Sequence, residues 1–347
     1  MRIAGRDVGP EQPPFVIAEL SGNHGGSLAR ALETVHAVAE SGADAIKLQT
    51  YTADTMTLPV DDPRFMIVDP NSLWSGRHLH ELYREAHTPW EWHAEIFAAA
   101  RARGLIAFSS PFDRTAVDLL VELGSPCLKI ASFEITDIPL IRAAAGTGLP
   151  LIISTGMATR EEIASATAAA EASGCSELAL LWCTSAYPAS PQSSALLGIP
   201  DLRGWSGYEV GLSDHTLGDA VAIASVALGA TLIEKHVTLD HDLETVDGAF
   251  SLDPAGLRSL VDGVRTAWLA TSDARYGPTP EEVPSLRFRR GLYFVRDVAA
   301  GDVVTSDDIR ALRPAAELAP LELDRLIGRT IVASARRGDP VTWGHVE

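Results

Sequence analysis

The stretch Gly211-Leu212-Ser213-Asp214-His215-Thr216 is followed by a second polar stretch, Glu234-Lys235-His236, whose glutamate and histidine lie twenty-one residues after Ser213 and His215. Each stretch follows a short apolar run. Both have the composition of the end of a β-strand. Because successive side chains of a strand point to opposite faces, the serine and histidine of the first stretch share a face, and so do the glutamate and histidine of the second. His215 and His236 are therefore candidate ligands of one divalent metal with open positions for a substrate. Hydrogen-bonded core histidines fit the same spacing.

Working outward from these two strands, short apolar runs recur along the chain, and each is followed by sequence with helical periodicity. Eight strand–helix units in succession are typical of a (β/α)8 TIM barrel. Ser27 and Thr159 are predicted to cap two of the helices at their N-termini. The predicted strands are residues 15–20, 44–50, 105–110, 127–132, 149–155, 178–183, 210–214 and 231–238, and the predicted helices are 28–40, 91–103, 114–123, 160–172, 219–228 and 254–270.

In the last quarter of the chain, short strand-like runs alternate with turns and brief helical stretches, and this pattern predicts a second, smaller domain. The sequence predicts a barrel over residues 1–270, a linker rich in turn residues over 271–284 and a small β-clip-like domain over 285–347. Two similar segments, Val298-Ala299-Ala300-Gly301-Asp302-Val303-Val304 and Ala335-Arg336-Arg337-Gly338-Asp339-Pro340-Val341, predict internal pseudosymmetry. The short elements expected there are strands at 292–295 and 330–332 and helical stretches at 306–309 and 323–327.

The composition of the chain excludes several classes of function. The 347 residues carry a formal net charge of −18, which argues against nucleic acid or an anionic membrane as a partner. No apolar run has the length of a membrane span, and the N-terminus lacks the apolar core of a signal peptide. The three cysteines, Cys127, Cys175 and Cys183, have neither metal-ligand spacing nor an even number for disulfides, so we expect a reduced, cytoplasmic protein.

Lysine is scarce, which makes its positions informative. The chain has three lysines against twenty-five arginines. Lys47 and Lys129 lie in apolar strand-like runs, where a buried ammonium is costly unless it lines a polar cavity. A compact ammonium group suits a phosphate or a carboxylate, so these two lysines are predicted to bind an anionic substrate. Lys235 has the opposite strand parity to His236, and its role stays open.

Further polar residues gather at the carboxyl ends of the predicted strands, where a TIM barrel carries its active site. The segment 51–89 is long for a connection between a strand and a helix, and such a segment is typical of a lid or a specificity element. The polar residues predicted at the strand ends are Glu19, Asn23, Lys47, Gln49, Lys129, Ser132, Glu134, Ser154, Ser185, Tyr187, Ser213, His215, Glu234 and His236.

Several of these stretches together resemble one enzyme family. They include Ile17-Ala18-Glu19-Leu20-Ser21-Gly22-Asn23-His24, Lys129-Ile130-Ala131-Ser132-Phe133-Glu134 and Ser154-Thr155-Gly156-Met157. With residues 43–50, 211–216 and 234–240, they make the chain similar to the sialic acid synthases over nearly its whole length, and its last part resembles that family's SAF domain. Residues 51–55, 88–93 and 247–252 resemble the pseudaminic acid branch.

The resemblance implies a condensation of phosphoenolpyruvate with an open-chain N-acylated amino sugar, 2,4-diacetamido-2,4,6-trideoxy-L-altrose in the pseudaminic branch. Water attacks C2 of the enol, C3 attacks the aldehyde, and phosphate leaves by C–O cleavage. A divalent metal, Mn²⁺ or Mg²⁺, would be held by His215 and His236 and would polarise the aldehyde. The resemblance implies catalytic roles for Glu19, Glu134, His215 and His236, and substrate-binding roles for Asn23, Lys47, Gln49, Lys129, Ser132, Ser154, Ser185, Tyr187, Ser213, Asp247 and Arg313.

Two departures from the family pattern are visible. Arg313 matches an arginine that reaches the partner subunit's active site in a domain-swapped homodimer, but Ala315-Ala316 follows where glycines are usual, which puts the conformation of that loop in doubt. Ser185 stands where the sialic branch carries asparagine. The resemblance also leaves an N-acetylneuraminate or legionaminate synthase open as an alternative.

Two readings outside the synthases also stay open. One is a Schiff-base aldolase with Lys129 as its nucleophile, because barrels host that chemistry too. The other is a carbohydrate-binding or ice-binding protein built around the C-terminal domain, against which the ring of polar residues on the barrel argues.

Overall fold

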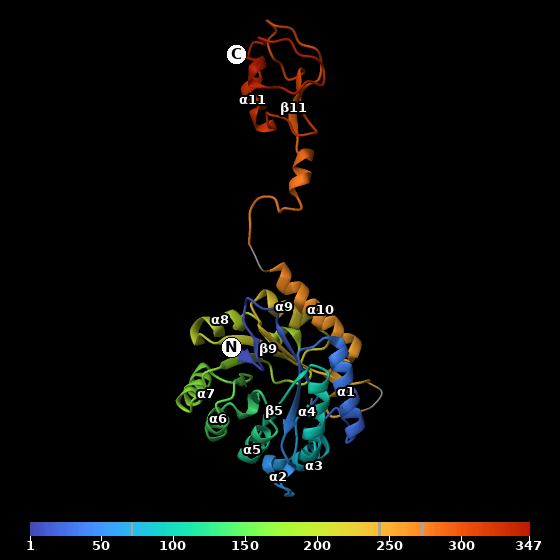
Figure 1. Ribbon diagram of the computed structural model, residues 1–347, viewed down its shortest axis with the longest axis vertical. Coiled ribbons are helices and arrows are strands. Elements are labelled where there is room, and N and C mark those ends of the chain that lie inside the picture. The colour runs from blue at the N-terminus through green and yellow to red at the C-terminus, as the bar shows by residue number, and fades with distance from the viewer. Residues whose placement is uncertain (71, 242–243, 272–273) are drawn as a thin grey trace. The chain divides into compact units, whose positions relative to one another are not determined.

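The computed structural model describes residues 1–70, 72–241, 244–271 and 274–347. The chain divides into two compact units, Met1–Asp273 and Ala274–Glu347 (Figure 1). Of the predicted linker 271–284, Ser272 and Asp273 lie outside the described residues, and its exact bounds stay a prediction. Within the described ranges, no helix combines the length and the apolar character needed to cross a membrane.

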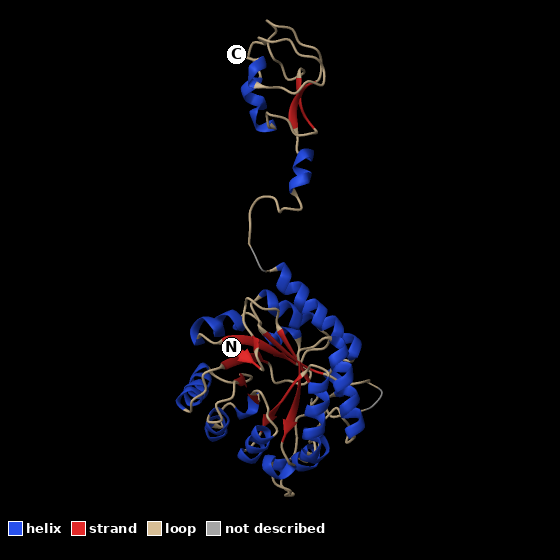
Figure 2. Ribbon diagram, viewed as in Figure 1, coloured by secondary structure: helices blue, strands red, loops and turns tan. Residues whose placement is uncertain are grey.

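The first unit is a closed barrel of eight parallel strands, in the order β10-β3-β4-β5-β6-β7-β8-β9, so the predicted TIM barrel is confirmed (Figure 2). Each predicted strand overlaps an observed one, with boundaries that differ by two residues at most. The strands are β3 (Phe15–Glu19), β4 (Ala45–Thr50), β5 (Ile106–Pro111), β6 (Leu128–Ile130), β7 (Leu151–Ser154), β8 (Leu178–Cys183), β9 (Glu209–Asp214) and β10 (Leu232–His236).

Helices surround this barrel, and local capping fixes where several of them begin. Arg30 N donates to Ser27 Oγ at 3.3 Å. Glu162 N donates to Thr159 Oγ1, and Thr159 N donates to the Glu162 carboxylate, which makes a capping box. Both predicted N-caps are therefore confirmed. The outer helices are α1 (Leu28–Ser41), α4 (His93–Ala102), α5 (Arg114–Glu122), α6 (Ile138–Ala145), α7 (Arg160–Ala172), α8 (Gly198–Ser206), α9 (Ala220–Ala227) and α10 (Pro254–Ala270).

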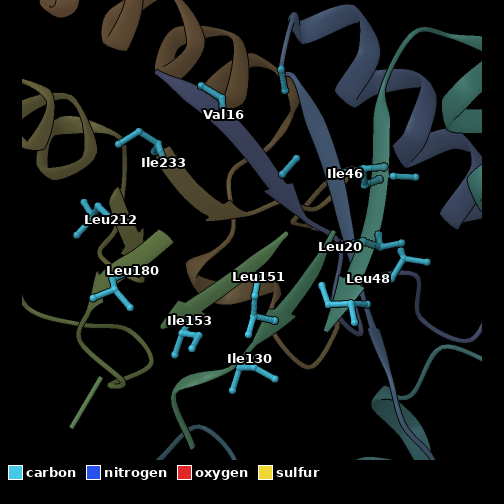
Figure 3. Packing of buried hydrophobic residues seen from close by; sticks show 14 of the residues in the cluster. Val16, Leu20, Ile46, Leu48, Ile130, Leu151, Ile153, Leu180, Leu212 and Ile233 are labelled. Atoms are coloured by element: carbon cyan, nitrogen blue, oxygen red, sulfur yellow. The ribbon is translucent and has the colours of Figure 1, made fainter. Parts of the chain in front are cut away.

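Two apolar layers hold the barrel together. The outer layer lies between strands and helices and contains Ile46, Leu180 and Ile233 (Figure 3). The inner layer fills the lumen near the amino ends of the strands, where Phe15 lies on the first strand of the barrel. An N-terminal hairpin that the sequence analysis did not predict, β1 (Arg2–Ile3) with β2 (Arg6–Asp7), adds Ile3 to this layer. The barrel is thus closed at its amino end, which leaves its carboxyl end for a polar cavity.

The long segment 51–89 forms short elements and is tied at both of its ends. It contains α2 (Ala53–Met56), the 3-10 turn Pro63–Phe65 and α3 (Leu79–Ala86), and the 3-10 turn Trp90–Trp92 follows. Asn71 lies outside the described residues. At its base, Thr50 Oγ1 lies 2.8 Å from His93 Nε2, and Trp90 Nε1 donates to Tyr51 O at 3.2 Å.

The second unit is built around an antiparallel pair, β11 (Gly291–Phe294) and β12 (Ile309–Leu312), with the short helix α11 (Leu323–Leu326) and the 3-10 turns Val283–Phe288, Pro320–Glu322 and Trp343–His345. The helical stretch predicted at 306–309 is wrong. Asp308 caps a turn by accepting from Thr305 N at 2.7 Å, and the chain then enters β12. The strand predicted at 330–332 is present as isolated bridges at Thr330 and Ile331.

The predicted repeat in the second unit is present as one turn used twice. Ala299 N donates to Asp302 Oδ2 at 2.8 Å, and Arg336 N donates to Asp339 Oδ2 at 2.7 Å. The two copies meet at a bridge between Val298 and the corresponding Ala335. Identical turn chemistry at matching positions explains why the two sequence segments look alike.

Candidate active site

A polar cavity opens at the carboxyl end of the barrel, where the amino-end plug leaves room. It offers a volume of about 50 Å³. Nearly every strand contributes a side chain, so the cavity is the convergence point of the whole sheet. Its lining residues are Glu19, Lys47, Gln49, Ser110, Phe112, Lys129, Ala131, Ser132, Phe133, Cys183, Tyr187, Ser213, His215, Glu234 and His236.

A buried cluster of two lysines and two carboxylates forms the floor of this cavity. Lys47 Nζ contacts Glu19 Oε2 and lies 3.9 Å from Glu234 Oε1. Lys129 Nζ donates to Glu234 Oε1 at 3.0 Å, and Ser213 Oγ donates to the same oxygen at 3.2 Å. Two positive charges therefore balance two negative charges in the substrate-free cavity.

The two carboxylates of this cluster have different environments. Burial alone would raise the pKa of Glu234, but the charges of Lys129 and Lys47 outweigh it and hold that pKa well below its usual range. Burial raises the pKa of Glu19, although Lys47 opposes the rise. Glu19 is therefore the carboxylate of the pair that takes up a proton more readily, which is a property of a general base or acid.

The two predicted histidines come together above this cluster. The ring centroids of His215 and His236 are 5.3 Å apart. His215 Nδ1 lies 2.9 Å from Thr184 O, and because a carbonyl can only accept, Nδ1 carries a proton and Nε2 is the nitrogen left for a metal or a second proton. Burial, followed by neighbouring positive charges, lowers the pKa of His236 well below its ordinary value, so this imidazole is neutral at pH 7.

A hexacoordinate divalent metal needs six donor atoms, and the histidine pair supplies only two of them. Within the described ranges, no group of three or more His, Cys, Asp or Glu side chains is arranged to hold a metal ion. His236 Nδ1 is buried and makes no hydrogen bond to any described residue, and it lies 3.8 Å from Asp247 Oδ2. A neutral imidazole with an unused nitrogen suits a metal, and two protein ligands leave the remaining positions to water and substrate.

Aromatic rings enclose the histidines on one side. The Tyr187 ring lies 4.4 Å from that of His215, and the Phe250 ring lies 5.0 Å from that of His236. Trp74, from the long segment 51–89, lies 5.8 Å from Tyr187. This wall excludes water from the histidine side of the cavity, which strengthens electrostatic interactions there.

A hydroxyl-lined corner lies where β7 ends. Gly156 N donates to Ser132 Oγ at 3.2 Å. A Cβ on Gly156 would come within 2.3 Å of Ser185 Oγ and 2.7 Å of Ser132 Oγ, so glycine is required for this close approach. Ser154 Oγ is buried and has no hydrogen-bond partner among the described residues, although Ser154 does not line the cavity.

The structure brings most of the predicted site residues to one cavity, with a few placed differently. Asn23 uses its amide in the fold: Nδ2 donates to Val237 O and to Ser251 Oγ, both at 2.8 Å. Thr245 Oγ1 donates to Asn23 Oδ1 at 2.6 Å. Asn23 thus holds the loop that follows β10.

Lys235, whose role the sequence left open, lies outside the cavity. It is fully buried and pairs with Asp214 Oδ2 at 2.6 Å, and that carboxylate also accepts from the Thr216 hydroxyl. Opposite parity to His236 turns its side chain away from the lumen, as alternation requires. This lysine holds the motif that carries His215.

Glu134, Asp247 and Arg313 are not among the residues that line the cavity. Burial raises the pKa of Glu134 to about 7. Burial also raises the pKa of Asp247, which accepts a hydrogen bond from Ser21 Oγ. Arg313 is exposed and directly follows β12 in the second unit.

Sequence reasoning missed several lining residues. Ser110, whose hydroxyl lies 3.2 Å from Lys47 Nζ, and Cys183 end two barrel strands. Glu234 was noted on its strand, but its place between both lysines was not foreseen. Strand alternation was the available signal for all three: Ser110 shares parity with Phe108, which lies in the lumen.

Comparison with known proteins shows which protein family this chain resembles in sequence and structure. The model of the NeuB family matches residues 34–276, and the SAF domain model matches residues 289–347. A pseudaminic acid synthase of Helicobacter pylori is 40% identical over 97% of this chain and 98% of its own length. An N,N'-diacetyllegionaminic acid synthase of Legionella pneumophila is 35% identical over 96% of this chain and 94% of its own. The crystal structure of an N-acetylneuraminic acid synthetase from Leptospira borgpetersenii superposes with a TM-score of 0.72 at 30% identity, covering 82% of this chain and 94% of the other.

Proposed function

We propose, because the chain belongs to the NeuB family, that it condenses phosphoenolpyruvate with 2,4-diacetamido-2,4,6-trideoxy-L-altrose, the reaction of a pseudaminic acid synthase. The single observation that carries the proposal is the buried cluster of Lys47, Lys129, Glu19 and Glu234 directly beneath the histidine pair. It places cationic groups for an anionic enol next to a site for an aldehyde.

In this proposal, the two lysines bind phosphoenolpyruvate. Lys47 and Lys129 are buried and converge on the cavity, so they can exchange their internal carboxylates for the carboxylate and phosphate of the substrate. Ser132 and Ser213 line the cavity, Ser185 lies beside Ser132 at Gly156, and we expect the three hydroxyls to donate to phosphate oxygens. Gln49 lies on the same strand face as Lys47 and adds an amide.

Bond making then follows from the positions of the acids and bases. A water oxygen bonds to C2 and loses its proton to Glu19, while the electrons of the C2–C3 double bond form a bond from C3 to the aldehyde carbon. The aldehyde oxygen gains a proton and becomes a hydroxyl. Collapse of the tetrahedral intermediate breaks the bond between C2 and the phosphate oxygen, the C2 hydroxyl loses its proton, and inorganic phosphate leaves.

His215 and His236 would hold a divalent metal, Mn²⁺ or Mg²⁺. When bound there, the metal would polarise the aldehyde oxygen as a Lewis acid. Tyr187 and Phe250 shield this site from bulk water, and Asp247 and Glu134 are placed to bind hydroxyl and amide groups of the sugar. Both carboxyls have raised pKa values caused by burial, which lets them donate as well as accept hydrogen bonds.

The assembly we propose is a homodimer in which Arg313 of the partner subunit completes the active site. What supports it is a row of exposed apolar side chains on the loops that follow successive barrel strands at the carboxyl end. Single exposed residues of this kind are ordinary, but a series on one rim indicates a surface that another chain covers. These residues are Phe133, Met157, Leu197 and Leu217, with 60%, 63%, 75% and 65% of their surface exposed.

The experiment that tests the function is phosphate release from phosphoenolpyruvate with Mn²⁺ and three sugars: the altrose, its legionaminate counterpart and N-acetylmannosamine. Turnover with the altrose supports the proposal. Turnover with another sugar keeps the mechanism and overturns the choice of branch. EDTA is expected to abolish release, and full activity after chelation would contradict the metal role of His215 and His236.

A Schiff-base aldolase is not favoured by the site. Lys129 Nζ donates to Glu234 Oε1 at 3.0 Å, so the amine is engaged in an ion pair, whereas Schiff-base chemistry needs it free to attack a carbonyl. A legionaminate synthase keeps some support from the 35% identity to such an enzyme, and the sugar panel separates the two.

A further inference from the structure

A second hollow lies beside the active cavity, with a volume of about 520 Å³. Residues between 73 and 85 of the long segment form one wall, and residues 241, 244–246, 248 and 249 of the loop after β10 form the other. Volumes of 300–1,000 Å³ are usual for small-molecule sites. The residues that line it are Leu73, Trp74, Arg77, Glu85, His241, Glu244, Thr245, Val246, Gly248 and Ala249.

The loop 244–251 separates this hollow from the histidine pair, and it presents one face to each. On one face, Asp247 lies 3.8 Å from His236, and Phe250 packs on the same imidazole. On the other face, Val246 and Ala249 line the hollow. The two spaces are therefore one loop apart.

Trp74 joins the two spaces. Its indole Nε1 donates to Val246 O at 2.9 Å, which holds the long segment against the loop. Its ring lies 5.8 Å from Tyr187, a lining residue of the active cavity, and Trp74 itself lines the hollow. The tryptophan is half-buried, so part of the indole face is open to a ligand.

The sizes of the two spaces show which part of a substrate each can take. The active cavity, with about 50 Å³, has room for roughly three to five water molecules. That is too little for phosphoenolpyruvate together with a six-carbon sugar bearing two acylamino groups. Since the aldehyde carbon must reach the histidines, the carbons farthest from it extend out of the cavity, past Tyr187.

We propose that the hollow receives the distal end of the amino sugar, its acylamino group at C4 and its methyl group at C6, and that Trp74 determines specificity by packing its indole against these methyl groups. This inference rests on the proposed function. An aromatic face gains from apolar contact and offers nothing to a hydroxyl, so a sugar with a 6-hydroxyl in place of the 6-deoxy carbon binds less well by roughly 10- to 200-fold.

The test compares Trp74→Ala and Trp74→Phe with the unaltered protein, by measuring KM for the amino sugar and for phosphoenolpyruvate separately. Trp74→Ala is expected to raise the KM for the sugar by about 10- to 100-fold and to leave the KM for phosphoenolpyruvate within about twofold. Trp74→Phe keeps an apolar face but loses the donor to Val246, and is expected to stay within about threefold. Trp205→Phe, at a tryptophan that packs on Arg160, is the matched control.

Two outcomes overturn the inference. One is an unchanged KM for the sugar in Trp74→Ala. The other is an equal loss in Trp74→Phe and Trp74→Ala, which would assign the effect to the hydrogen bond that holds Val246. Ala249→Trp, which adds bulk to the hollow and leaves Trp74 in the chain, is expected to raise the KM for the sugar as Trp74→Ala does, and no rise would also overturn the inference.

Sugar binding measured by saturation-transfer NMR separates this inference from the proposed function. If the unaltered protein binds the altrose without releasing phosphate, the proposed function fails, and the loss or retention of the sugar signal in Trp74→Ala still decides the role of Trp74. If it binds no amino sugar at all, both fail. Turnover with an unchanged sugar affinity in the variants overturns the role of Trp74 alone.

Discussion

At the scale of single residues, Glu234 determines the charge balance of the cavity. One of its oxygens accepts from both Lys129 and Ser213 and lies 3.9 Å from Lys47. Buried ion pairs add little net stability compared with apolar residues, but removing one partner strands the other charge. A substitution that removes one charge of the cluster is therefore expected to lower the stability of the fold, whereas one that removes a positive and a negative charge together is expected to change it little.

Lys129→Met is expected to lower the free energy of unfolding by about 3–5 kcal/mol, because it strands the buried Glu234 carboxylate. Lys129→Met with Glu234→Gln is expected to recover most of this loss. Urea denaturation followed by circular dichroism measures both. Arg160→Met is the control, since its pair with Asp201 is exposed and contributes about 0.5 kcal/mol or less. Equal stability of the single and double variants would contradict the prediction.

Glu134 is expected to make stability depend on pH. Burial raises its pKa from 4.5 to about 7, so between these values the folded protein holds a proton that the unfolded chain has released. The stabilisation is present below pH 4.5 and is lost as the pH rises through 7. Glu134→Gln is therefore expected to be more stable than the unaltered protein by about 1–3 kcal/mol at pH 8 and similar to it near pH 4.5. A difference that is the same at both pH values in urea titrations would refute this.

The sequence predicted individual residues where composition made them unusual. Lys47 and Lys129 stood out because lysine is scarce, and both line the cavity. Alternation along a strand predicted the face of the sheet on which each side chain lies, but not the residue that it contacts. The resemblance implied that Asn23 binds substrate, but nothing in the sequence showed that its amide also holds the loop after β10, because that pairing spans more than 200 residues of sequence.

At the scale of elements, the long segment 51–89 is an anchored lobe. Its base is fixed by the buried chain His93–Thr50–Ser109, with contacts of 2.8 and 2.6 Å. A second buried contact ties Thr88 to His24 at 3.3 Å. The loop has the length that is typical of a lid, but these hydrogen bonds hold both of its ends against the barrel. This explains why the motif 88–93 carries two tryptophans and a histidine without lining the cavity.

Removing the His93 contact is expected to loosen this lobe. His93→Phe takes away the acceptor for Thr50 and the donor to Pro89 O, and is expected to lower the free energy of unfolding by about 1–3 kcal/mol. It is also expected to speed proteolytic cleavage within residues 51–89, measured by limited proteolysis with mass spectrometry. His36→Phe, at an exposed site on α1, serves as the control. Cleavage at an unchanged rate would show that the lobe is held elsewhere.

Elements were predictable where a periodic pattern was long and capped. The strand 178–183 and the helices 160–172 and 254–270 were predicted with their observed bounds. The helix α8 was missed because Gly198, Pro200 and Gly204 disguise it as a loop. The stretch 306–309 looked helical from local composition, but Asp308 accepts from Thr305 and closes a turn into β12. The pairing of β12 with β11 therefore determined the structure of this stretch, and local composition did not.

At the scale of the whole molecule, each of the two units has its own apolar core. The barrel has an inner and an outer layer, and the second unit has a separate cluster that includes Leu292, Phe294 and Val341. Units with separate cores fold independently as a rule. The repeated turn of the second unit lies entirely within it.

A chain ending at residue 273 is expected to keep the thermal midpoint of the barrel within a few degrees, because its core is complete without the second unit. It is expected to bind phosphoenolpyruvate and to release phosphate about 100-fold more slowly, since Arg313 is absent. Calorimetry measures the midpoint and the binding, and a coupled phosphate assay measures release. Full activity of the shortened chain would contradict the role of Arg313.

The balanced charge cluster has a consequence for the heat of substrate binding. When an anion takes Lys47 and Lys129, Glu234 loses the two counter-charges that hold its pKa down, while it remains buried. A buried carboxylate without a counter-charge binds a proton. Association is therefore coupled to proton uptake from the solution, and the apparent binding enthalpy is expected to change with the ionisation heat of the buffer. Substrate binding thus draws from the solution a proton that the later steps can consume.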